Sequence, residues 1–504
     1  MSIPISMAKK KGAWRGRRRC VLADSPREGR VTNRSVASAT ASLVDDTTGT
    51  RIGVAESRGT TWGLPRHCAT TERRTARNLL AMLVIALVSI GCGGSGVSAP
   101  SGFAPVDDAH AVFWDRQTTE TATLMADIAA RYNGANPPLP VKIETTGNYG
   151  EIYQKTMASI QAKRLPAMAV SYESMTAQYA ASGAVASLDS HVADGERGLA
   201  PEEMGDYFET VLASCRFEEH GGALLSFPLA KSVLMLYANH RVLREAGIEK
   251  PPSTWGDFLT QCRTIKEKTG KPGIALSVDC STISALILSM GGEVLKDGAL
   301  QYDQPASIQV FELLETLTKE GLAYQIAART FDDEAAFAAN KIAFTLRTSA
   351  GSANMAMAMG GKNDDWSVNP IPQADPAKPA TIVFGPNVTL FAVGDAQEKA
   401  AWGFVKYFTS REVMTEWTLA TGYVPFRKSL AEDPKIKAYF DAWPSNRSAY
   451  DCLSFARTEP NVAGWQQIRK LVEQAETSVL SGLKTGREAA LALQAEAQAE
   501  LERS

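Results

Sequence analysis

The sequence predicts an α/β protein built from two lobes. From Ala109 onward, short apolar runs alternate with segments of helical spacing, which is typical of a largely parallel, doubly wound sheet. This alternation starts again after Gly221–Gly222. The chain from Cys92 onward has 413 residues, enough for two sizeable cores. We therefore expect two lobes.

The first lobe opens with strands that alternate with helices. The segment 119–132 places Leu124, Ile128 and Tyr132 at helical spacing, so it is predicted as an amphipathic helix. The apolar runs on either side of it are short enough for buried strands. We expect strands at 110–115, 139–146 and 166–174, and helices at 119–132 and 150–164.

The second lobe follows the same pattern. Two strand runs are expected within 223–239, followed by a short helix that ends at Gly247. Ser253 or Thr254 is placed to cap the next helix, and Pro305 suits the first position of a helix that runs to Lys319. Further helices are expected at 334–339, 396–408, 411–419 and from Ile468 to the C-terminus.

Upstream of the lobes lies a segment that is typical of an export signal. Residues 79–90 (LLAMLVIALVSI) carry no charge and follow three arginines between positions 73 and 77. As a helix they would span about 18 Å, short of the ~30 Å hydrocarbon core of a membrane. The following residues, ending at Cys92, resemble a bacterial lipobox, which implies a lipid on Cys92 and anchoring in the periplasm or at the cell surface. An ordinary secretory signal with an incidental cysteine is the alternative.

The segments on either side of this signal are predicted to be irregular. Residues 1–78 lack periodicity and are rich in Ser, Thr and Arg, so we expect an unstructured leader that reflects a start codon placed too early. Residues 93–107 are rich in Ser, Pro and Gly and are predicted as a flexible tether.

The charge distribution argues against a nucleic-acid partner. Residues 1–78 hold 16 Lys and Arg against 6 Asp and Glu, which leaves 37 basic and 49 acidic residues in the rest of the chain. The folded body is therefore acidic. After Cys92 it contains four cysteines, whose spacing matches no zinc template and permits either disulfides or buried thiols: Cys215, Cys262, Cys280 and Cys452.

Motifs of known catalytic chemistry are missing from the sequence. It contains no H-E-x-x-H, G-x-S-x-G or G-x-x-x-x-G-K-[ST], and its histidines are dispersed. We therefore expect a binding protein without metal or cofactor rather than an enzyme. Two alternatives stay open: an exported glycan hydrolase, which would need two carboxylates across a cleft, and a solute sensor not coupled to transport.

Three segments resemble the family-1 extracellular solute-binding proteins of ABC importers. They are TGYVPFRKSL at 421–430, SFPLAKSVLMLYANHRVLREAGIEKPPSTWGDFL at 226–259 and FDDEAAFAANKIAFTL at 331–346. In the last of these, Asn340 stands where the family usually has Gly, and Asn tolerates a left-handed turn. The resemblance covers roughly Ala109 to Leu501.

This resemblance implies a type II periplasmic-binding-protein-like fold, with a ligand cleft between the lobes and a hinge that the chain crosses more than once. We expect lobe 1 at 108–222 and 346–393, and lobe 2 at 223–345 and 394–504. It also implies a monomer that closes on a small solute and docks on the transmembrane subunits of an ABC permease.

Within the family, the glycerol-3-phosphate-binding branch is the most similar. TTGNYGEIYQK at 145–155 and QQIRKLVEQAETSVLSGLKT at 466–485 carry this resemblance. It implies that the ligand residues are Tyr149, Glu173, Ser232, Ser349, Gly385 and Tyr423, where Ser349 could be replaced by its neighbour Ala350 or Ser352. The branch also uses an arginine where this chain has Asn461, and the nearest arginine is Arg457.

The implied ligand set has the chemistry for a sugar, a polyol or a glycerol-phosphate-type solute. An ionised Glu173 accepts hydrogen bonds from hydroxyls, and Tyr149 and Tyr423 offer flat apolar faces with a phenol oxygen. Gly385 lets a backbone N–H come close to the ligand. A phosphate would favour a guanidinium, so Asn461 makes a neutral sugar or polyol competitive.

Overall fold

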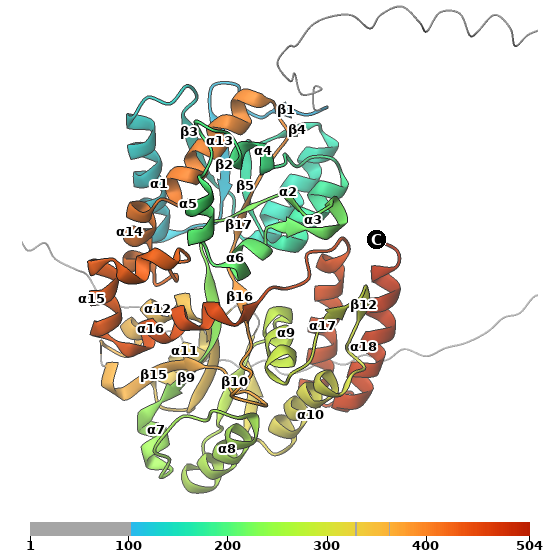
Figure 1. The fold of residues 1–504 in the computed structure, drawn as a ribbon. Helices are drawn as coiled ribbons and strands as arrows, with labels where there is room; N and C mark the ends of the chain where they lie inside the picture. The colour runs from blue at the N-terminus through green and yellow to red at the C-terminus, as the bar shows by residue number, and fades with distance from the viewer. Residues whose placement is uncertain (1–101, 328–329, 362) are drawn as a thin grey trace, which may run out of the picture. The chain divides into compact units, whose positions relative to one another are not determined.

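The computed structural model describes residues 102–327, 330–361 and 363–504 (Figure 1). Residues 94–504 form one compact unit, and the structure is described for this unit alone. The predicted leader, the signal segment and Cys92 lie outside the described residues. Within the described ranges, no helix combines the length and apolar character needed to cross a membrane.

The first lobe is built on a five-stranded sheet. Its parallel part, β3-β2-β5, confirms the three predicted strands, and β17 adds antiparallel to β5. Helices α1 and α13 pack against this sheet, as Figure 1 shows. In sheet order the strands are β3 (Val141–Thr145), β2 (Ala111–Asp115), β5 (Met168–Ser171), β17 (Asn387–Leu390) and β8 (Phe227–Pro228), and the helices are α1 (Thr119–Gly134), α2 (Tyr149–Gln161), α3 (Glu173–Ala181) and α13 (Asp395–Phe408).

The second lobe is built on a seven-stranded sheet centred on β9. All eight residues of β9 are buried, and three strands pair with it. The path runs β13 (Ala323–Gln325), β10 (Ile274–Leu276), β14 (Phe344–Thr348), β9 (Ser232–Asn239), β16 (Thr381–Phe384) and β18 (Ala456–Arg457), with β15 (Trp366–Pro370) also on β9. Its helices include α8 (Trp255–Thr269), α9 (Cys280–Ser289), α10 (Pro305–Lys319), α17 (Trp465–Leu480) and α18 (Gly486–Leu501).

Local sequence signals set several helix ends. The Thr254 hydroxyl accepts a hydrogen bond from the Asp257 backbone N–H at 3.0 Å, and α8 ends at Gly270 in the left-handed conformation. Helix α10 begins at Pro305, as predicted. Asn340 is also left-handed, with φ of 56°. The single helix predicted from Ile468 onward is instead two helices, because Gly482 ends the first and Thr485 caps the second.

Shorter elements complete the two lobes. They are β1 (Ala104–Pro105), β4 (Arg164–Leu165), α4 (Asp189–Val192), α5 (Pro201–Asp206), α6 (Glu209–Ala213), β6 (Arg216–Phe217), β7 (Ala223–Leu224), α7 (His240–Glu245), β11 (Leu295–Lys296), β12 (Ala299–Leu300), α11 (Asp332–Ala338), α12 (Ser352–Ala358), α14 (Arg411–Thr421), α15 (Pro434–Ala442) and α16 (Pro444–Asp451).

The observed strand pairing and helix packing place three segments differently from the predicted domain boundaries. Strands β15 and β16, within the segment assigned to lobe 1, pair with β9 of the second sheet. Helices α13 and α14, assigned to lobe 2, pack against α1 of the first lobe. Ala104–Pro105, in the predicted tether, pair with β4. Periodicity identifies a strand or helix but not the sheet that it joins, which is why these boundaries were misplaced.

Within the described residues, the chain passes between the two sheets at three places. Leu229–Lys231 connect β8 to β9, and Gly385–Pro386 connect β16 back to β17. The third connection, residues 422–433, leads from α14 to α15 and α16, and α16 packs on β15. The first and third connections are joined by the Val424 N–H, which donates to the Lys231 carbonyl at 2.9 Å. The resulting hinge is crossed more than once, as predicted.

The four cysteines of the described chain are free and buried. They are Cys215, Cys262, Cys280 and Cys452. Burial raises the pKa of the Cys215 thiol to about 11 and that of Cys452 to about 12, and it raises the pKa of the other two as well. The open choice between disulfides and buried thiols is therefore resolved in favour of thiols.

Candidate ligand-binding site

Polar and aromatic side chains gather at the carboxyl ends of the parallel strands of the first sheet. Arg116 follows β2 directly, Tyr172 follows β5 directly, and Tyr149 opens the helix after β3. These strands lie side by side in parallel register, so the three residues emerge at one edge. In open α/β sheets, this edge is where ligands bind.

The three residues form a cluster with Tyr423. The Tyr149 and Tyr172 rings lie 4.2 Å apart between centroids, and the Arg116 guanidinium carbon lies 5.0 Å from the Tyr149 ring centre. Burial raises the pKa of the phenols of Tyr149, Tyr172 and Tyr423, and the positive charge of Arg116 opposes this shift at each of them. At neutral pH the phenols therefore stay protonated and can donate hydrogen bonds.

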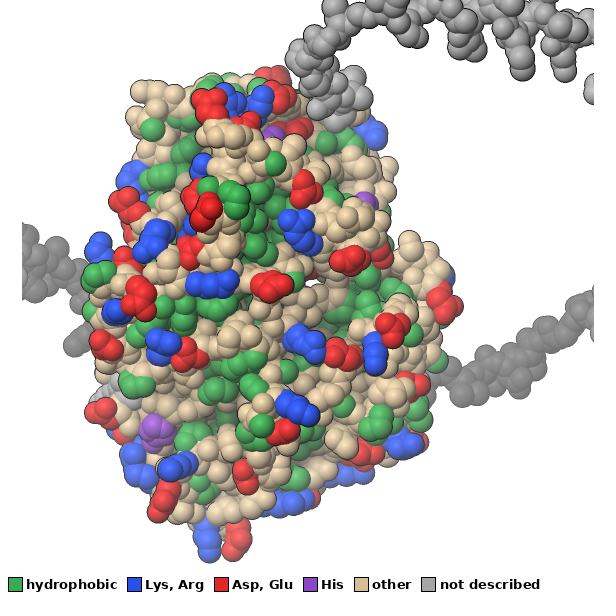
Figure 2. All heavy atoms as spheres, viewed as in Figure 1, with side chains coloured by type: hydrophobic (Ala, Val, Ile, Leu, Met, Phe, Trp, Pro, Cys, Tyr) green, Lys and Arg blue, Asp and Glu red, His purple; other side chains and the backbone are tan. Residues whose placement is uncertain are grey.

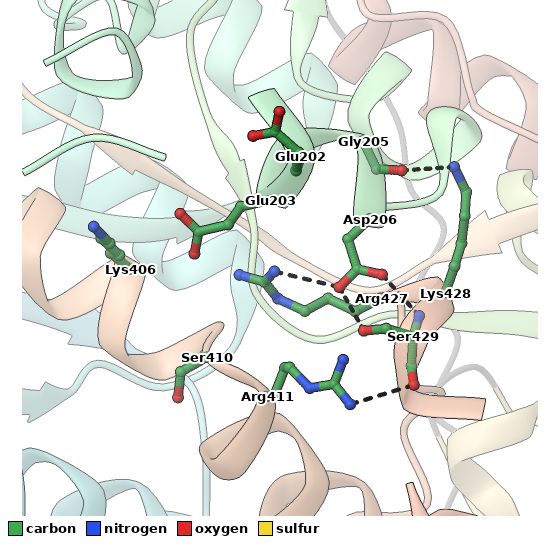
Figure 3. A pocket seen from close by; sticks show the side chains of 10 residues that line it. All are labelled: Glu202, Glu203, Gly205, Asp206, Lys406, Ser410, Arg411, Arg427, Lys428 and Ser429. Carbon is green, nitrogen blue, oxygen red and sulfur yellow. Dashed lines mark hydrogen bonds and ion pairs between the residues drawn. The ribbon is translucent and has the colours of Figure 1, made fainter. Parts of the chain in front are cut away.

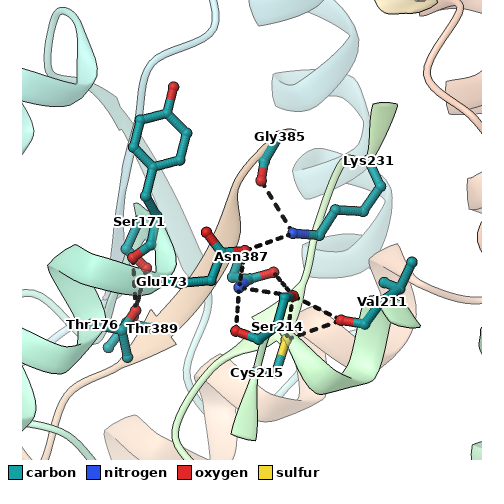
Figure 4. A network of polar contacts seen from close by, with 11 residues as sticks. Ser171, Glu173, Thr176, Val211, Ser214, Cys215, Lys231, Gly385, Asn387 and Thr389 are labelled. Carbon is teal, nitrogen blue, oxygen red and sulfur yellow. Dashed lines mark hydrogen bonds and ion pairs between the residues drawn. The ribbon is translucent and has the colours of Figure 1, made fainter. Parts of the chain in front are cut away.

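Glu173 belongs to a buried polar network at the hinge (Figure 4). The Lys231 ammonium is fully buried and lies 3.4 Å from Glu173 Oε1. It also donates to the Gly385 carbonyl at 3.1 Å, and Asn387 Nδ2 donates to the same Glu173 oxygen at 3.3 Å. Lys231 thus connects a strand end of the first lobe to two hinge segments.

Ser232 and Ser349 lie next to this network. Ser232 begins β9 and pairs with Phe384, which precedes Gly385. The Ser349 hydroxyl accepts a hydrogen bond from the Val233 N–H at 3.3 Å. Ser349, Ser352 and Tyr423 also line one cavity of about 10 Å³, room for about one water molecule. A solute would have to displace the walls of this cavity to bind there.

The two lobes touch each other beside the site. The Gln466 amide of α17 donates to the Ser174 hydroxyl of α3 at 2.5 Å. Nearby, the Asn461 amide donates to the Arg216 carbonyl, and the Ala463 N–H donates to Glu219 Oε2 at 3.4 Å. These contacts join α17 and the segment before it to the first lobe.

The structure brings all six predicted ligand residues into one connected region. Tyr149 and Tyr423 both lie near Arg116. Glu173 and the Gly385 carbonyl both bond to Lys231. Ser232 begins β9, and Ser349 accepts a hydrogen bond from the next residue of this strand. Asn461 and Arg457 do not join this region through the contacts described. The side chain of Arg457 is 52% exposed and forms an ion pair with Glu293 at 2.8 Å.

Sequence reasoning missed four residues of this region: Arg116, Tyr172, Lys231 and Asn387. Arg116 directly follows the predicted strand 110–115, and Tyr172 lies near the end of the predicted strand 166–174, at the edge where this class of sheet binds ligands. Lys231 is the one charged residue within the apolar run 223–239, and a charge in a buried run signals a paired or functional group. Only Asn387 lacked a comparable signal.

Asp115 adds a buried carboxyl to the same strand end. One oxygen, Oδ2, accepts a hydrogen bond from the Gln117 N–H at 3.2 Å, while Oδ1 has no partner among the described residues. Burial raises the pKa of Asp115 to about 6, although hydrogen bonds and the neighbouring Arg116 act in the opposite direction. The folded protein therefore keeps the proton on this carboxyl up to a higher pH than the unfolded chain does.

Asp115→Asn is expected to raise the free energy of unfolding above pH 6 by up to about 3 kcal/mol. Because the folded pKa exceeds the unfolded one, the stabilising contribution of Asp115 is complete below about pH 4 and is lost as the pH rises through about 6. Urea unfolding of both proteins across this interval measures the effect. The advantage of the variant should grow with pH; parallel pH profiles would contradict the assignment.

A larger groove of about 640 Å³ lies elsewhere on the chain, between α5 and residues 427–429 (Figure 3). Several of its polar groups form hydrogen bonds with other residues of the groove. Asp206 accepts from the Ser429 hydroxyl at 2.6 Å and from Arg427 at 3.4 Å, and the Lys428 ammonium donates to the Gly205 carbonyl at 2.9 Å. None of the six predicted ligand residues lines it, so we do not assign the solute to this groove.

The described residues contain no group of three or more His, Cys, Asp or Glu side chains that could hold a metal ion. On the face shown in Figure 2, basic and acidic side chains are interspersed and do not form a broad patch of one sign.

Comparisons with known proteins agree with this geometry. The family model described as bacterial extracellular solute-binding protein matches residues 127–442. The sn-glycerol-3-phosphate-binding periplasmic protein UgpB of Escherichia coli K12 is 24% identical over 413 residues, covering 77% of this chain and 92% of its own. UgpB of Yersinia pseudotuberculosis is 24% identical over 398 residues, covering 74% and 88%.

Two solved structures have the same fold. UgpB from Mycobacterium tuberculosis in complex with glycerophosphocholine superposes with a TM-score of 0.69 at 20% identity, covering 79% of this chain and 99% of its own. The GacH receptor of Streptomyces glaucescens, solved unliganded and with acarbose, gives a TM-score of 0.68 at 21% identity, with 79% and 99% coverage. The two-lobed periplasmic-binding-protein fold predicted from the sequence is thus confirmed.

Proposed function

Because the chain belongs to the bacterial extracellular solute-binding proteins, we propose that it captures a small hydroxylated solute between its lobes and delivers it to an ABC permease. The solute is a sugar, a polyol or a glycerol-phosphate-type ester. The observation that carries this proposal is the gathering of Tyr149, Tyr423 and Glu173 at one sheet edge and hinge. No covalent step is part of it.

Each group has a role in this proposal. The phenols of Tyr149, Tyr172 and Tyr423 donate hydrogen bonds and cover the C–H faces of the solute. Glu173 accepts from solute hydroxyls through the carboxylate oxygen that Lys231 leaves free, and Ser232 and Ser349 add hydroxyls. Closure of the lobes excludes water, so solute binding shifts an open–closed equilibrium that the permease recognises.

Three relatives motivate the choice of solutes. The E. coli relative is named for sn-glycerol 3-phosphate, and the mycobacterial structure contains glycerophosphocholine. GacH was solved with acarbose, a carbohydrate-like ligand. A phosphate ester and a neutral sugar are therefore both candidates at this identity.

Calorimetric titration of residues 94–504 tests the proposal. The panel is sn-glycerol 3-phosphate, glycerophosphocholine, maltose and glycerol. We expect saturable binding of at least one member, and that member should be recovered chemically unchanged. A panel without any binding would reject the proposal, whereas release of a cleaved product would favour the hydrolase alternative. Uptake by the reconstituted permease separates an importer component from a sensor.

We also propose that Cys92 carries the lipid that anchors the protein outside the cytoplasm. The support is the lipobox-like sequence Ser89-Ile90-Gly91-Cys92 after an uncharged apolar run. Mass spectrometry of the N-terminal peptide from membrane-extracted protein tests this. A diacylglyceryl group on Cys92 is expected, and an unmodified Cys92 or a terminus elsewhere would refute it.

A further inference from the structure

The position at which the sequence led us to expect a phosphate-binding arginine does not supply one. Asn461 is neutral, and its amide donates a hydrogen bond to the Arg216 carbonyl. Arg457, the nearest arginine in the sequence, is directed to Glu293 and is half exposed. A phosphate ester would therefore need a different cation.

Two other cations near the site are already compensated by carboxylates. The Arg469 guanidinium lies 5.7 Å from the Tyr172 ring centre but forms ion pairs with both Glu459, at 2.6 Å to Oε1, and Asp279, at 3.5 Å. The Lys231 ammonium is paired with Glu173 at 3.4 Å. Recruiting either group to an anion would leave a buried carboxylate without its partner, which is costly.

Arg116 is in a different situation. Among the described residues, no carboxylate oxygen lies within 4.0 Å of its guanidinium, so Arg116 has no ion-pair partner. Its surroundings are instead the aromatic rings and phenols of Tyr149, Tyr172 and Tyr423, and it is partly buried among them. A partly buried guanidinium that no carboxylate contacts directly is poised to receive an anion, although Asp115 is its neighbour in the chain.

From this contrast we infer that Arg116 binds the anionic group of the solute, and that the solute is therefore a phosphate ester of a polyol. This inference rests on the proposed function and deepens it. The planar fork of Arg116 suits two phosphate oxygens, and the neighbouring phenols donate further hydrogen bonds to them. The polyol end then lies toward Glu173 and the serines.

Binding of the anion by Arg116 also explains how the protein binds a phosphate ester with Asn461 in place of the arginine of the related branch. The positive charge comes from the strand end of β2 in the first lobe rather than from the connection before α17 in the second. The anion can therefore bind to the first lobe before closure, and closure then brings the second lobe onto the polyol. Arg116 is a specificity-determining residue in this account.

Calorimetry of matched variants tests the inference. Arg116→Gln is expected to weaken binding of sn-glycerol 3-phosphate about 10- to 100-fold, because charge-assisted hydrogen bonds are lost. Binding of maltose or glycerol, where measurable, should change less than threefold. Arg116→Lys keeps the charge without the planar fork, so its affinity for sn-glycerol 3-phosphate should lie between those of the wild type and Arg116→Gln. Arg457→Gln, the control that removes a paired arginine outside the cluster, should bind like the wild type.

The outcomes distinguish failure of the inference about Arg116 from failure of the proposed function. If the Arg116→Gln variant binds sn-glycerol 3-phosphate within twofold of the wild type, the inference is overturned while the proposed function stands. If the wild type binds only maltose or glycerol, the inference is again overturned and the function stands. If the wild type binds no member of the panel, both fall. Thermal unfolding checks that each variant is folded, and weaker phosphate-ester binding at higher salt supports the role of charge.

Discussion

Lys231→Met is expected to lower the free energy of unfolding by about 3–5 kcal/mol, because it leaves the Glu173 carboxylate buried without its partner. The Lys231 side chain is fully buried and that of Glu173 is only 10% exposed, so water cannot replace the missing ammonium. Loss of the bond to the Gly385 carbonyl adds to the effect. Urea unfolding followed by circular dichroism measures the change.

Two further variants make this result specific. Lys399→Met removes a lysine that pairs with Asp395 at 2.7 Å, but this pair is 42% and 71% exposed, so a loss below about 1 kcal/mol is expected. Combining Lys231→Met with Glu173→Gln removes both charges and should recover part of the stability. If the double variant is no more stable than Lys231→Met alone, charge pairing is not the source of the effect.

Gly385→Ala is expected to destabilise the hinge by about 4 kcal/mol, through strain at a special backbone conformation together with a clash. Gly385 has φ of 99°, a region that side-chain-bearing residues rarely adopt. A Cβ there would lie 2.0 Å from the Ala230 carbonyl oxygen, which belongs to the neighbouring hinge segment. The two connections would have to move apart, and solute affinity should fall with stability. Chemical unfolding and calorimetry measure the two effects.

Gly394→Ala separates the two causes. Gly394 has φ of 110°, but a Cβ there would meet nothing within 4 Å. Its variant therefore reports the backbone cost alone, expected at about 1–2 kcal/mol. The excess loss at Gly385 is then the cost of the clash in the hinge. Equal losses at the two positions would show that close approach of the hinge segments is unimportant.

The elements of the fold were largely predictable from the sequence. The helix at 119–132 shows clear helical periodicity, and the strand at 110–115 is a short apolar run. Thr254 and Pro305 are strong start signals for helices. Sheet membership was not predictable in this way. Strands β15 and β16 pair with β9 through backbone hydrogen bonds. The pattern of apolar and polar side chains does not record which sheet a strand joins.

The residues predicted for the candidate site all came from the family resemblance. It pointed to Tyr149, Glu173 and Tyr423, which the structure brings into one region. It could not point to Lys231 or Arg116, because their roles depend on what surrounds them. Whether a cation is free or paired is decided by contacts between segments distant in the sequence, such as Lys231 with Glu173, 58 positions apart.

The buried thiols have a practical consequence for experiments on lobe closure. Maleimide dyes react with thiolates, and burial with raised pKa keeps Cys215, Cys262, Cys280 and Cys452 in the unreactive protonated form. A cysteine introduced at exposed Leu483, which is 80% accessible, would therefore be labelled selectively in residues 94–504. Paired with a second dye on the first lobe, it would turn the protein into a fluorescent reporter of its own solute.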